Sequence, residues 1–350
     1  MASSRIFSDL SEKNLTVTVF PVKTGGIFSK VPHSPALLKS LDLHMATFDV
    51  VMCHSLWNPL ATFSMRLLRK KGGRYSLMPH GMLDPLVLMR NRWKKLTWAT
   101  LWERSNVEAA SLIVFNTEAE ERKARLSGWR IRRTFVLPHL IELSSWKHLP
   151  PGSVFEDLFP QVRGAEVVLF VGRLNWVKNL DKLIDALAIV RQSRPSAMLV
   201  CVGPDSDGYR SELERHSNGL DLDGKVLFTG MLLGDQLKAA YARANVAVLV
   251  SQKENFGLVV AEALASGLPV VVSTGVDLCA NWESNGPVRR VTPTPLEIAA
   301  AIIELLDRSD INGLPDRDAL ALAAEACGRS NHILRLDDTY WSTIPRSNHD

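Results

Sequence analysis

Two glutamates in the second half of the chain, Glu254 and Glu262, have a spacing that suits one shared ligand. Glu254 follows the apolar run 246–250, which predicts a strand, and Glu262 lies in a helical pattern that opens near Phe256 and Gly257. Backbone N–H groups at a helix start favour an anion such as a pyrophosphate. Carboxylates instead accept hydrogen bonds from sugar hydroxyls. The pattern therefore predicts a phosphate site flanked by two hydroxyl acceptors, which suits a nucleotide-sugar.

Two cations, Arg173 and Lys178, form a second candidate element after the apolar run 167–171 and the turn at Gly172. Open α/β sheets bind their ligands at the carboxyl ends of strands, where these residues are expected to lie. The planar fork of Arg and the mobile charge of Lys both suit a pyrophosphate. Taken singly, the cations also fit a solvated loop, and the glutamates fit an exposed helix start. Their occurrence together favours the ligand site.

The run 253–271 resembles the Glu-x7-Glu element of the retaining glycosyltransferases of family GT4, which have the GT-B fold. The resemblance implies that Glu254 meets the donor sugar and that Glu262 binds the ribose hydroxyls. It implies that Arg173 and Lys178 neutralise the charge of the leaving nucleoside diphosphate. The residues implied for donor binding are Gly172, Arg173, Lys178, Glu254, Asn255, Phe256, Gly257, Leu258 and Glu262. Those implied for catalysis are His80, Glu254, Arg173 and Lys178.

Three segments of the first half, 50–57, 76–83 and 115–120, also resemble this family, through His-x-Leu-Trp, Pro-His-Gly-Met-Leu and Thr-Glu-Ala-Glu. His80 ends a predicted strand at a glycine turn, so its ring can reach a cleft between two domains. The resemblance places the related histidine near the donor sugar. His54 has the same setting. Either histidine also fits a structural role at a strand end.

Apolar runs alternate with helical patterns along the chain, which is typical of a parallel α/β architecture. The resemblance implies a GT-B fold, with two Rossmann-like doubly wound domains facing across a cleft and a C-terminal helix returning to the first domain. The expected domains are an acceptor-side domain at 1–150, a nucleotide-sugar domain at 151–325 and the returning helix at 326–350. The predicted strands are 15–20, 49–54, 74–79, 111–116, 134–137, 167–172, 198–203, 226–229, 246–251 and 269–273. The predicted helices include 179–193, 208–216, 234–243, 257–266 and 296–306, and 143–165 is predicted as a linker.

The composition favours a globular protein of the reducing cytoplasm. No apolar run reaches the ~18 residues of a membrane span, and the start lacks the layout of a signal peptide. The four cysteines have no metal or CxxC spacing. Cys53 and Cys201 lie in strand-like runs and are predicted to be buried. The resemblance to family GT4 implies that no metal is required. Asp205 and Asp207 have Asp-x-Asp spacing, but they follow Pro204 and are interpreted as turn residues, so no metal and no cofactor is expected.

The charge is divided unequally between the halves. Residues 1–150 carry 22 Lys and Arg against 11 Asp and Glu, and the rest of the chain carries 19 against 26. A basic half favours an anionic partner. The segment 90–104 holds three Trp among its cations, which fits a helix lying on an anionic membrane surface, such as the inner membrane. It also fits a packed helix with solvated cations. No nucleic-acid-binding motif is present, so nucleic acid is not an expected partner.

The start of the chain departs from the family. Enzymes of this type begin with an apolar strand and a Gly-Gly loop, and residues 1–14 contain neither. The run 15–20 resembles the family's second strand, and Gly25 and Gly26 come too late to replace the loop. The resemblance therefore covers 15–341, and the chain is expected to lack the first strand.

Two hypotheses follow from these patterns together with the resemblance to family GT4, which alone implies retention of configuration and the kind of pathway. The first is a retaining hexosyltransferase that moves a sugar from a UDP- or GDP-sugar to a saccharide or lipid-linked acceptor, in surface polysaccharide or glycolipid synthesis. The second is a truncated relic that binds nucleotide and transfers nothing. A dinucleotide-binding protein is disfavoured because no Gly-x-Gly-x-x-Gly follows a strand. A sugar epimerase or phosphorylase of the same two-domain plan is a further alternative.

Overall fold

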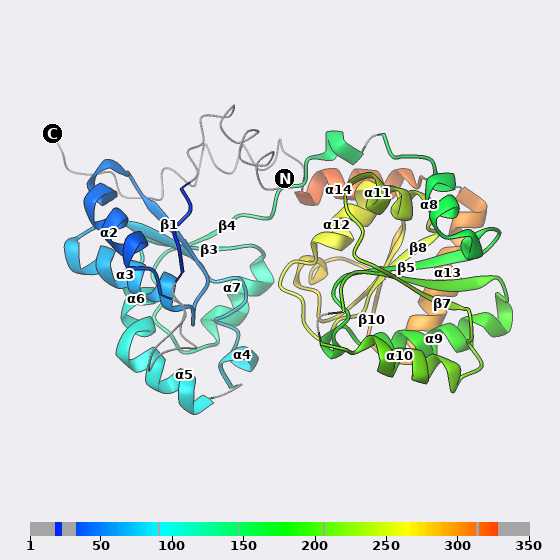
Figure 1. The fold of residues 1–350 in the computed structure, drawn as a ribbon, viewed down its shortest axis with the longest axis horizontal. Helices are drawn as coiled ribbons and strands as arrows, with labels where there is room; N and C mark the ends of the chain where they lie inside the picture. Colours follow the sequence, from blue (N-terminus) through cyan, green and yellow to red (C-terminus); the bar gives the residue numbers. More distant parts are fainter. Residues whose placement is uncertain are drawn as a thin grey trace. The chain divides into compact units, whose positions relative to one another are not determined.

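The chain folds into two compact α/β units, each built on a sheet of parallel strands (Figure 1). The computed structural model describes residues 18–22, 33–89, 92–146, 148–205, 207–312 and 315–327. Among them, the first unit comprises 18–114 and 123–135, and the second comprises 115–122 and 136–327. The predicted α/β class with two domains is therefore confirmed.

The first unit contains, in its described part, a four-stranded sheet of order β1-β2-β3-β4. β1 pairs in parallel with β2, with His54 opposite Met78 at the end of the ladder. β2 pairs in parallel with β3. The strands are β1 (Val51–His54), β2 (Tyr75–Met78), β3 (Leu112–Phe115) and β4 (Thr134–Val136). The helices are α2 (Pro35–His44), α3 (Pro59–Lys71), α4 (Pro85–Met89), α5 (Arg92–Trp98), the π-helix η2 (Ala99–Glu103) and α6 (Arg104–Ala109). The helix α7 (Glu118–Arg125) is divided between the units, with residues 118–122 in the second and 123–125 in the first.

The strand predicted at 15–20 does not form in its described part. Residues 18–22 have no regular secondary structure, and Val19 is 73% exposed. Pro21 has no backbone N–H to give to a ladder, and its carbonyl instead accepts a hydrogen bond from Ser34 Oγ at 2.8 Å. Residues 15–17 lie outside the described residues.

The second unit contains, within the described residues, a six-stranded parallel sheet of order β10-β9-β8-β5-β6-β7. Five strands match the predicted ones within two residues. The strands are β5 (Glu166–Val171), β6 (Ala197–Val202), β7 (Val226–Gly230), β8 (Val246–Leu249), β9 (Val270–Ser273) and β10 (Val288–Val291). The helices are α8 (Gly152–Leu158), α9 (Leu180–Ser193), α10 (Arg210–Asn218), α11 (Gly234–Arg243), α12 (Leu258–Ala265), α13 (Pro295–Asn312) and α14 (Arg317–Cys327).

The prediction that 143–165 is a linker is partly wrong, because α8 lies inside this segment. Phe155 of α8 is fully buried in the core of the second unit. Arg243 of α11 fastens this segment by donating to Glu156 Oε1 and to the Val162 carbonyl, both at 2.6 Å. Residues 328–350, which include most of the predicted returning helix, lie outside the described residues.

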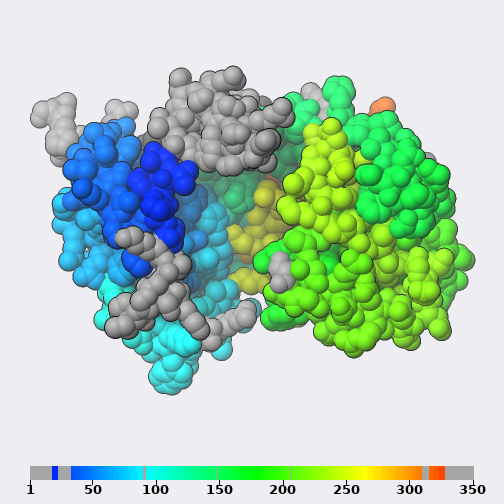
Figure 2. Space-filling view, viewed as in Figure 1, coloured from blue at the N-terminus to red at the C-terminus, as the bar shows by residue number. Residues whose placement is uncertain are grey.

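The core of the second unit is a sheet that is buried on both faces. Every residue of β6, β8 and β9 is buried, which is why these strands read as continuous apolar runs. α9 packs with α13 and α10, whereas α12 packs with α14 and α11 packs with α8. Figure 1 shows α9, α10 and α13 on one face of the sheet and α8, α11, α12 and α14 on the other. In Figure 2 the visible face of this unit is formed mainly by the segment from α8 to α11.

Cys53 and Cys201 are buried, as predicted.

The carboxyl ends of β5 and β6 approach each other unusually closely. Gly172 follows β5 at φ 153° and Gly203 follows β6 at φ 147°. A Cβ atom at Gly203 would lie 2.0 Å from the Gly172 carbonyl oxygen. Glycine is therefore required here, and this contact fixes the point from which Arg173 leaves the sheet.

We predict that Gly203→Ala lowers the free energy of unfolding by roughly 2–4 kcal/mol, because its Cβ must displace the backbone after β5. Urea denaturation measures the change. Gly219→Ala is the matched control, since Gly219 has φ −66° and a Cβ there would meet ordinary contacts. Equal effects of the two substitutions would contradict the proposed close contact.

Candidate functional site

The cationic loop after β5 is shaped by Asn175. Its side-chain oxygen caps the short 3-10 helix η5 (Trp176–Lys178) by accepting a hydrogen bond from the Val177 N–H at 3.0 Å. Its amide nitrogen donates to Asp207 Oδ2 at 2.7 Å. Arg173 places an exposed guanidinium at the start of the loop. Lys178, the last residue of η5, places its ammonium near the end of the loop.

A buried amide joins this loop to the one that follows β8. Asn179 is 1% exposed and has a left-handed backbone, with φ 53°. Its Nδ2 donates to the Val250 carbonyl at 2.8 Å, and its Oδ1 accepts from Gln252 Nε2 at 3.1 Å. The Gln252 backbone N–H donates to the Val177 carbonyl at 2.8 Å. The two loops that carry the predicted donor residues are therefore held together by three hydrogen bonds.

The structure brings Lys178 and Glu254 into direct contact. Lys178 Nζ donates to Glu254 Oε2, and the two side chains are 18% and 26% exposed. Sequence reasoning placed both residues at the donor but did not predict this ion pair. A partly buried carboxylate that holds an ammonium keeps its charge in place and keeps the ammonium oriented toward the site.

The turn between Glu254 and α12 is fixed by its backbone. The Glu254 N–H donates to the Gly275 carbonyl at 2.9 Å, and the Asp277 N–H donates to the Glu254 carbonyl at 3.0 Å. Gly257 is the N-cap of α12 at φ 84°, and a Cβ there would lie 3.1 Å from Val276 Cγ1. The turn therefore directs the N–H groups of the first helical turn outward from the end of the sheet.

Two residues of this turn have different environments. Phe256 is 4% exposed and packs edge-on against His139, with ring centroids 4.9 Å apart, so its side chain anchors the turn. Asn255 Oδ1 is buried and has no hydrogen-bond partner among the described residues. A buried amide oxygen without a partner is costly unless a ligand or water satisfies it. Leu258 begins α12.

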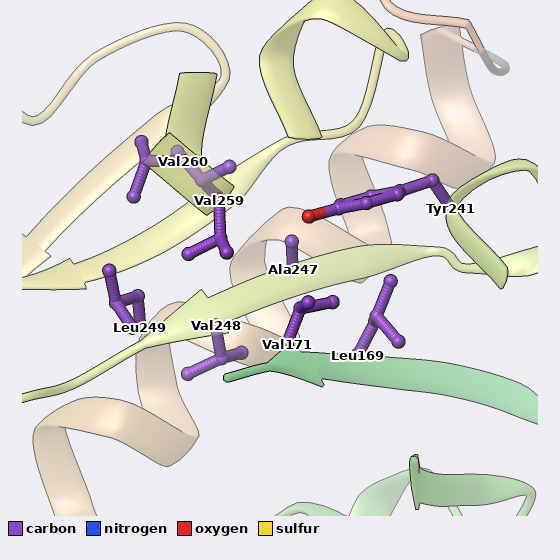
Figure 3. A pocket seen from close by; sticks show the side chains of 9 residues that line it. Leu169, Val171, Tyr241, Ala247, Val248, Leu249, Val259 and Val260 are labelled. Carbon is purple, nitrogen blue, oxygen red and sulfur yellow. The ribbon is translucent and has the colours of Figure 1, made fainter. Parts of the chain in front are cut away.

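Glu262 is held by a tyrosine that sequence reasoning missed. Tyr241 Oη donates to Glu262 Oε2 at 2.8 Å, and the tyrosine is 1% exposed. Burial raises the pKa of Glu262, and the hydrogen bond from Tyr241 opposes that rise. Burial and the nearby carboxylate raise the pKa of Tyr241 well above its usual value. Figure 3 shows its hydroxyl directed across a small apolar cavity toward Val259 and Val260 of α12.

In the first unit, the two predicted histidines meet at the ends of β1 and β2. His54 Nδ1 and His80 Nε2 lie 2.9 Å apart, and the rings are stacked with a 17° angle between their planes. Desolvation of the His54 ring lowers its pKa. The two facing ring nitrogens can share one N–H···N hydrogen bond when one of them carries a proton.

The loops beside this pair contain strained backbone. Ser55, Trp57 and His80 all have positive φ, at 75°, 59° and 51°. Such conformations cost of order 1–3 kcal/mol each, persist where the surroundings enforce them, and concentrate at functional sites. The strain at the ends of two neighbouring strands supports a functional role for this edge.

Glu103, which sequence reasoning also missed, enforces part of that strain. Its carboxylate is fully buried at the end of the π-helix η2. Oε1 accepts hydrogen bonds from the Trp57 N–H at 3.0 Å, from Thr62 Oγ1 at 2.6 Å and from Trp98 Nε1 at 3.3 Å. These three hydrogen bonds fix the loop after β1. The signal in the sequence was a single acidic residue in a segment that is otherwise rich in Trp and cations.

Comparison with known families agrees with this arrangement. The model of glycosyl transferases group 1 matches residues 159–325, and that of the glycosyl transferase 4-like domain matches residues 5–139. The chain belongs to the GT4 glycosyltransferases. The second match begins ahead of residue 15, where the resemblance was predicted to start.

Two curated relatives match part of this GT4 chain. A D-inositol 3-phosphate glycosyltransferase of Kineococcus radiotolerans is 32% identical over 179 residues, which cover 49% of this chain and 41% of the relative. An alpha-monoglucosyldiacylglycerol synthase of Streptococcus pneumoniae is 29% identical over 177 residues, which cover 50% of this chain and 39% of the relative. The chain therefore spans less than half the length of these two relatives.

The GT-B fold is shown by similarity to solved structures. Anabaena HepE in complex with UDP-glucose has a TM-score of 0.75 and 21% identity, over 97% of this chain and 89% of that one. The expected fold is thus confirmed for this GT4 protein.

The basic segment 90–104, which was predicted to meet a membrane, is partly packed against the first unit and partly exposed. Trp98 and Trp102 contact each other and Phe63 of α3, with ring centroids 4.6–6.2 Å apart, so these two side chains are half-buried against the first unit. Trp93 is 81% exposed. Arg90 lies outside the described residues. No helix in the described part of the chain has the length and apolarity to cross a bilayer.

We predict that Glu262→Gln changes stability and nucleotide binding in opposite directions. Because burial raises the pKa of Glu262 in the folded chain, the stability that its protonated form contributes is lost as pH rises through that pKa. The variant, which does not titrate and still accepts from Tyr241, should therefore gain stability relative to the natural chain as pH rises from about 4 to about 8. Its affinity for nucleotide should fall.

Urea denaturation at a series of pH values measures this difference. Glu304→Gln is the control of opposite sign, because the hydrogen bond from Arg289 lowers the pKa of Glu304. Its stability relative to the natural chain should fall as pH rises. The same pH trend in both variants would contradict the assignment.

Proposed function

We propose that this chain is a retaining glycosyltransferase that moves a hexose from a nucleoside-diphosphate sugar to a saccharide or lipid-linked acceptor. The observation that carries the proposal is the Lys178–Glu254 ion pair, held beside the start of α12 by the buried Asn179. An ammonium, a nearby guanidinium and helix N–H groups suit a diphosphate, and two carboxylates suit the hydroxyls of a sugar and a ribose.

The donor is proposed to be a UDP- or GDP-sugar. Anabaena HepE, which shares the fold, forms a complex with UDP-glucose, and this supports a uridine nucleotide. Both curated relatives are named for transfer of a sugar, one to inositol 3-phosphate and the other in glycolipid synthesis. These names support a role in glycolipid or surface polysaccharide synthesis, in the cytoplasm or at the inner membrane. The exposed Trp93 and the cations around it are proposed to meet an anionic membrane surface.

The proposed reaction breaks the bond between the anomeric carbon and the diphosphate through an oxocarbenium-like state. The electron pair stays on the departing phosphate oxygen, where Arg173, Lys178 and the N–H groups at the start of α12 stabilise the new charge. The backbone of Phe256, Gly257 and Leu258 is proposed to face this phosphate, after the turn at Gly172 has placed the cations.

On the sugar, Glu254 is proposed to accept hydrogen bonds from the donor hydroxyls while it still orients Lys178. Glu262 is proposed to bind the ribose through the oxygen that Tyr241 does not use. Asn255 offers its buried Oδ1 as a further acceptor. Retention follows when the acceptor hydroxyl attacks the face that the diphosphate leaves, and its proton passes to the departing phosphate.

The histidine pair of the first unit is proposed to serve the sugar and the acceptor. His80 is fixed in a strained backbone and bonded to His54, so its ring has one orientation. A positioned imidazole contributes by hydrogen bonding to a hydroxyl of the reacting sugars.

We predict that the full chain binds one of UDP, GDP and ADP saturably in a calorimetric titration. Arg173→Ala and Glu262→Ala should each weaken this binding about 10-fold to 100-fold, the equivalent of a charged hydrogen bond. Arg163→Ala is the matched control, because Arg163 forms an exposed pair with Asp157 in the same unit. Binding that survives both substitutions would refute the donor site.

We predict that His80→Ala slows release of nucleoside diphosphate from the matching nucleotide-sugar by roughly 100-fold, the size of the effect of one transition-state donor. Its affinity for the nucleotide should not change, because the proposed donor residues lie in the second unit. His216→Ala is the control, since His216 pairs with Asp185 on the surface of that unit. Saturable nucleotide binding with no turnover in the natural chain would favour the non-catalytic alternative.

A further inference from the structure

The first unit contains a pocket of about 400 Å³ that the proposed donor site does not use. Its volume is within the range of small-molecule sites. Two Trp, three cations and several aliphatic side chains line it, and none of its described lining residues is acidic. The residues that matter here are Trp57, Trp129, Arg92, Lys95, Arg104, Met89 and Leu96. This combination of three cations, apolar walls and no acidic side chain in the described lining distinguishes the pocket from an ordinary surface hollow.

The aromatic walls hold two of the cations. The Trp57 and Trp129 rings meet edge to face, with centroids 5.8 Å apart. Lys95 Nζ lies 5.5 Å from the centroid of Trp57, and Arg104 Cζ lies 5.8 Å from that of Trp129. Cations over aromatic faces are attracted to them. These two charges are therefore ordered before any ligand arrives, which lowers the entropic cost of binding an anion.

The pocket adjoins the strained histidine edge. Trp57 lies three residues after His54, and the buried Glu103 fixes its backbone. Its indole N–H donates to the Met82 carbonyl at 3.4 Å, and the Leu56 N–H contacts Met82 Sδ at 3.1 Å. Trp57 and Met82 belong to the loops that follow β1 and β2, so a ligand against the Trp57 ring lies beside the loops at whose bases His54 and His80 meet.

A further part of the pocket wall is apolar and exposed to solvent. Met89 and Leu96 are 68% and 42% exposed. Leu86, close to this wall in sequence, is 71% exposed. Aliphatic side chains beside a cluster of cations match an amphiphile, because a chain removes their surface from water while its anionic head meets the charges.

We propose that this pocket binds an organic phosphate that carries an apolar chain. The phosphate meets Arg92, Lys95 and Arg104, and the chain covers Met89 and Leu96. The two indole rings contact the group that joins head and chain. The inference rests on the proposed function, since it names the class of acceptor that such an enzyme would glycosylate.

The test is a calorimetric titration of the full chain with octyl phosphate, kept below its micelle concentration. Saturable binding is expected, at least about 10-fold tighter than that of inorganic phosphate, glucose 6-phosphate or octyl glucoside, because each of these lacks the chain or the phosphate. The double variant Lys95→Gln with Arg104→Gln should lose at least about 10-fold, and Trp129→Ala should lose affinity too.

The matched control is Arg66→Gln with Lys70→Gln, which removes two cations from a separate hollow beside α3 in the same unit. Circular dichroism and Tm verify that each variant folds. Equal losses in the control, or no loss in the pocket variants, would overturn the site. Octyl glucoside binding as tightly would overturn the phosphate. Tighter binding of glucose 6-phosphate would overturn the amphiphile in favour of a soluble phosphate ester.

The two proposals fail separately. Nucleotide binding depends on Arg173 and Glu262 of the second unit, and octyl phosphate binding depends on the pocket of the first. Loss of octyl phosphate binding in a chain that still binds nucleotide would overturn the pocket alone. Octyl phosphate binding in a chain that binds no nucleotide would overturn the donor site alone.

Discussion

The buried side chain of Asn179 is the interaction on which the donor side depends. It lies where η5 ends and α9 begins, in a left-handed conformation that Asn tolerates better than most residues. Its two hydrogen bonds bind the loop after β5 to the loop after β8, so Lys178 and Glu254 meet although 76 positions separate them. Without these hydrogen bonds, the charged loops after β5 and β8 would each be solvated separately. The ion pair is thus a consequence of a neutral, buried hydrogen-bond network.

The first unit uses the same physical device with a different residue. A buried carboxylate, Glu103, accepts hydrogen bonds from the Trp57 backbone and from side chains of two helices. It holds the loop after β1 in a strained form, beside the His54–His80 pair. In both units a buried polar group fixes the loop that carries or adjoins the candidate site residues. A buried polar group that makes several hydrogen bonds favours one arrangement of the segments around it, which is what a binding site requires.

Much of this could be read from the sequence. The five strands of the second unit were predicted because strands buried on both faces are continuous apolar runs. β10 was missed because Arg289 and Arg290 interrupt its short apolar pattern, and α8 was missed because a single helix of seven residues lies among prolines and glycine. The roles of Tyr241 and Glu103 depend on contacts between elements far apart in the chain, which periodicity does not encode. The Lys178–Glu254 pair follows from the adjacency of β5 and β8 in the sheet order, which the motifs alone do not give.

The most direct test of the donor site is a crystal structure of the full chain with the nucleoside diphosphate that it binds most tightly. We expect the distal phosphate within hydrogen-bond distance of Arg173, Lys178 and the N–H groups at the start of α12. We also expect the ribose hydroxyls against the Glu262 carboxylate, with the Tyr241 hydrogen bond kept. A nucleotide bound elsewhere, or a diphosphate that leaves Lys178 and Arg173 untouched, would contradict the assignment of this edge as the donor site.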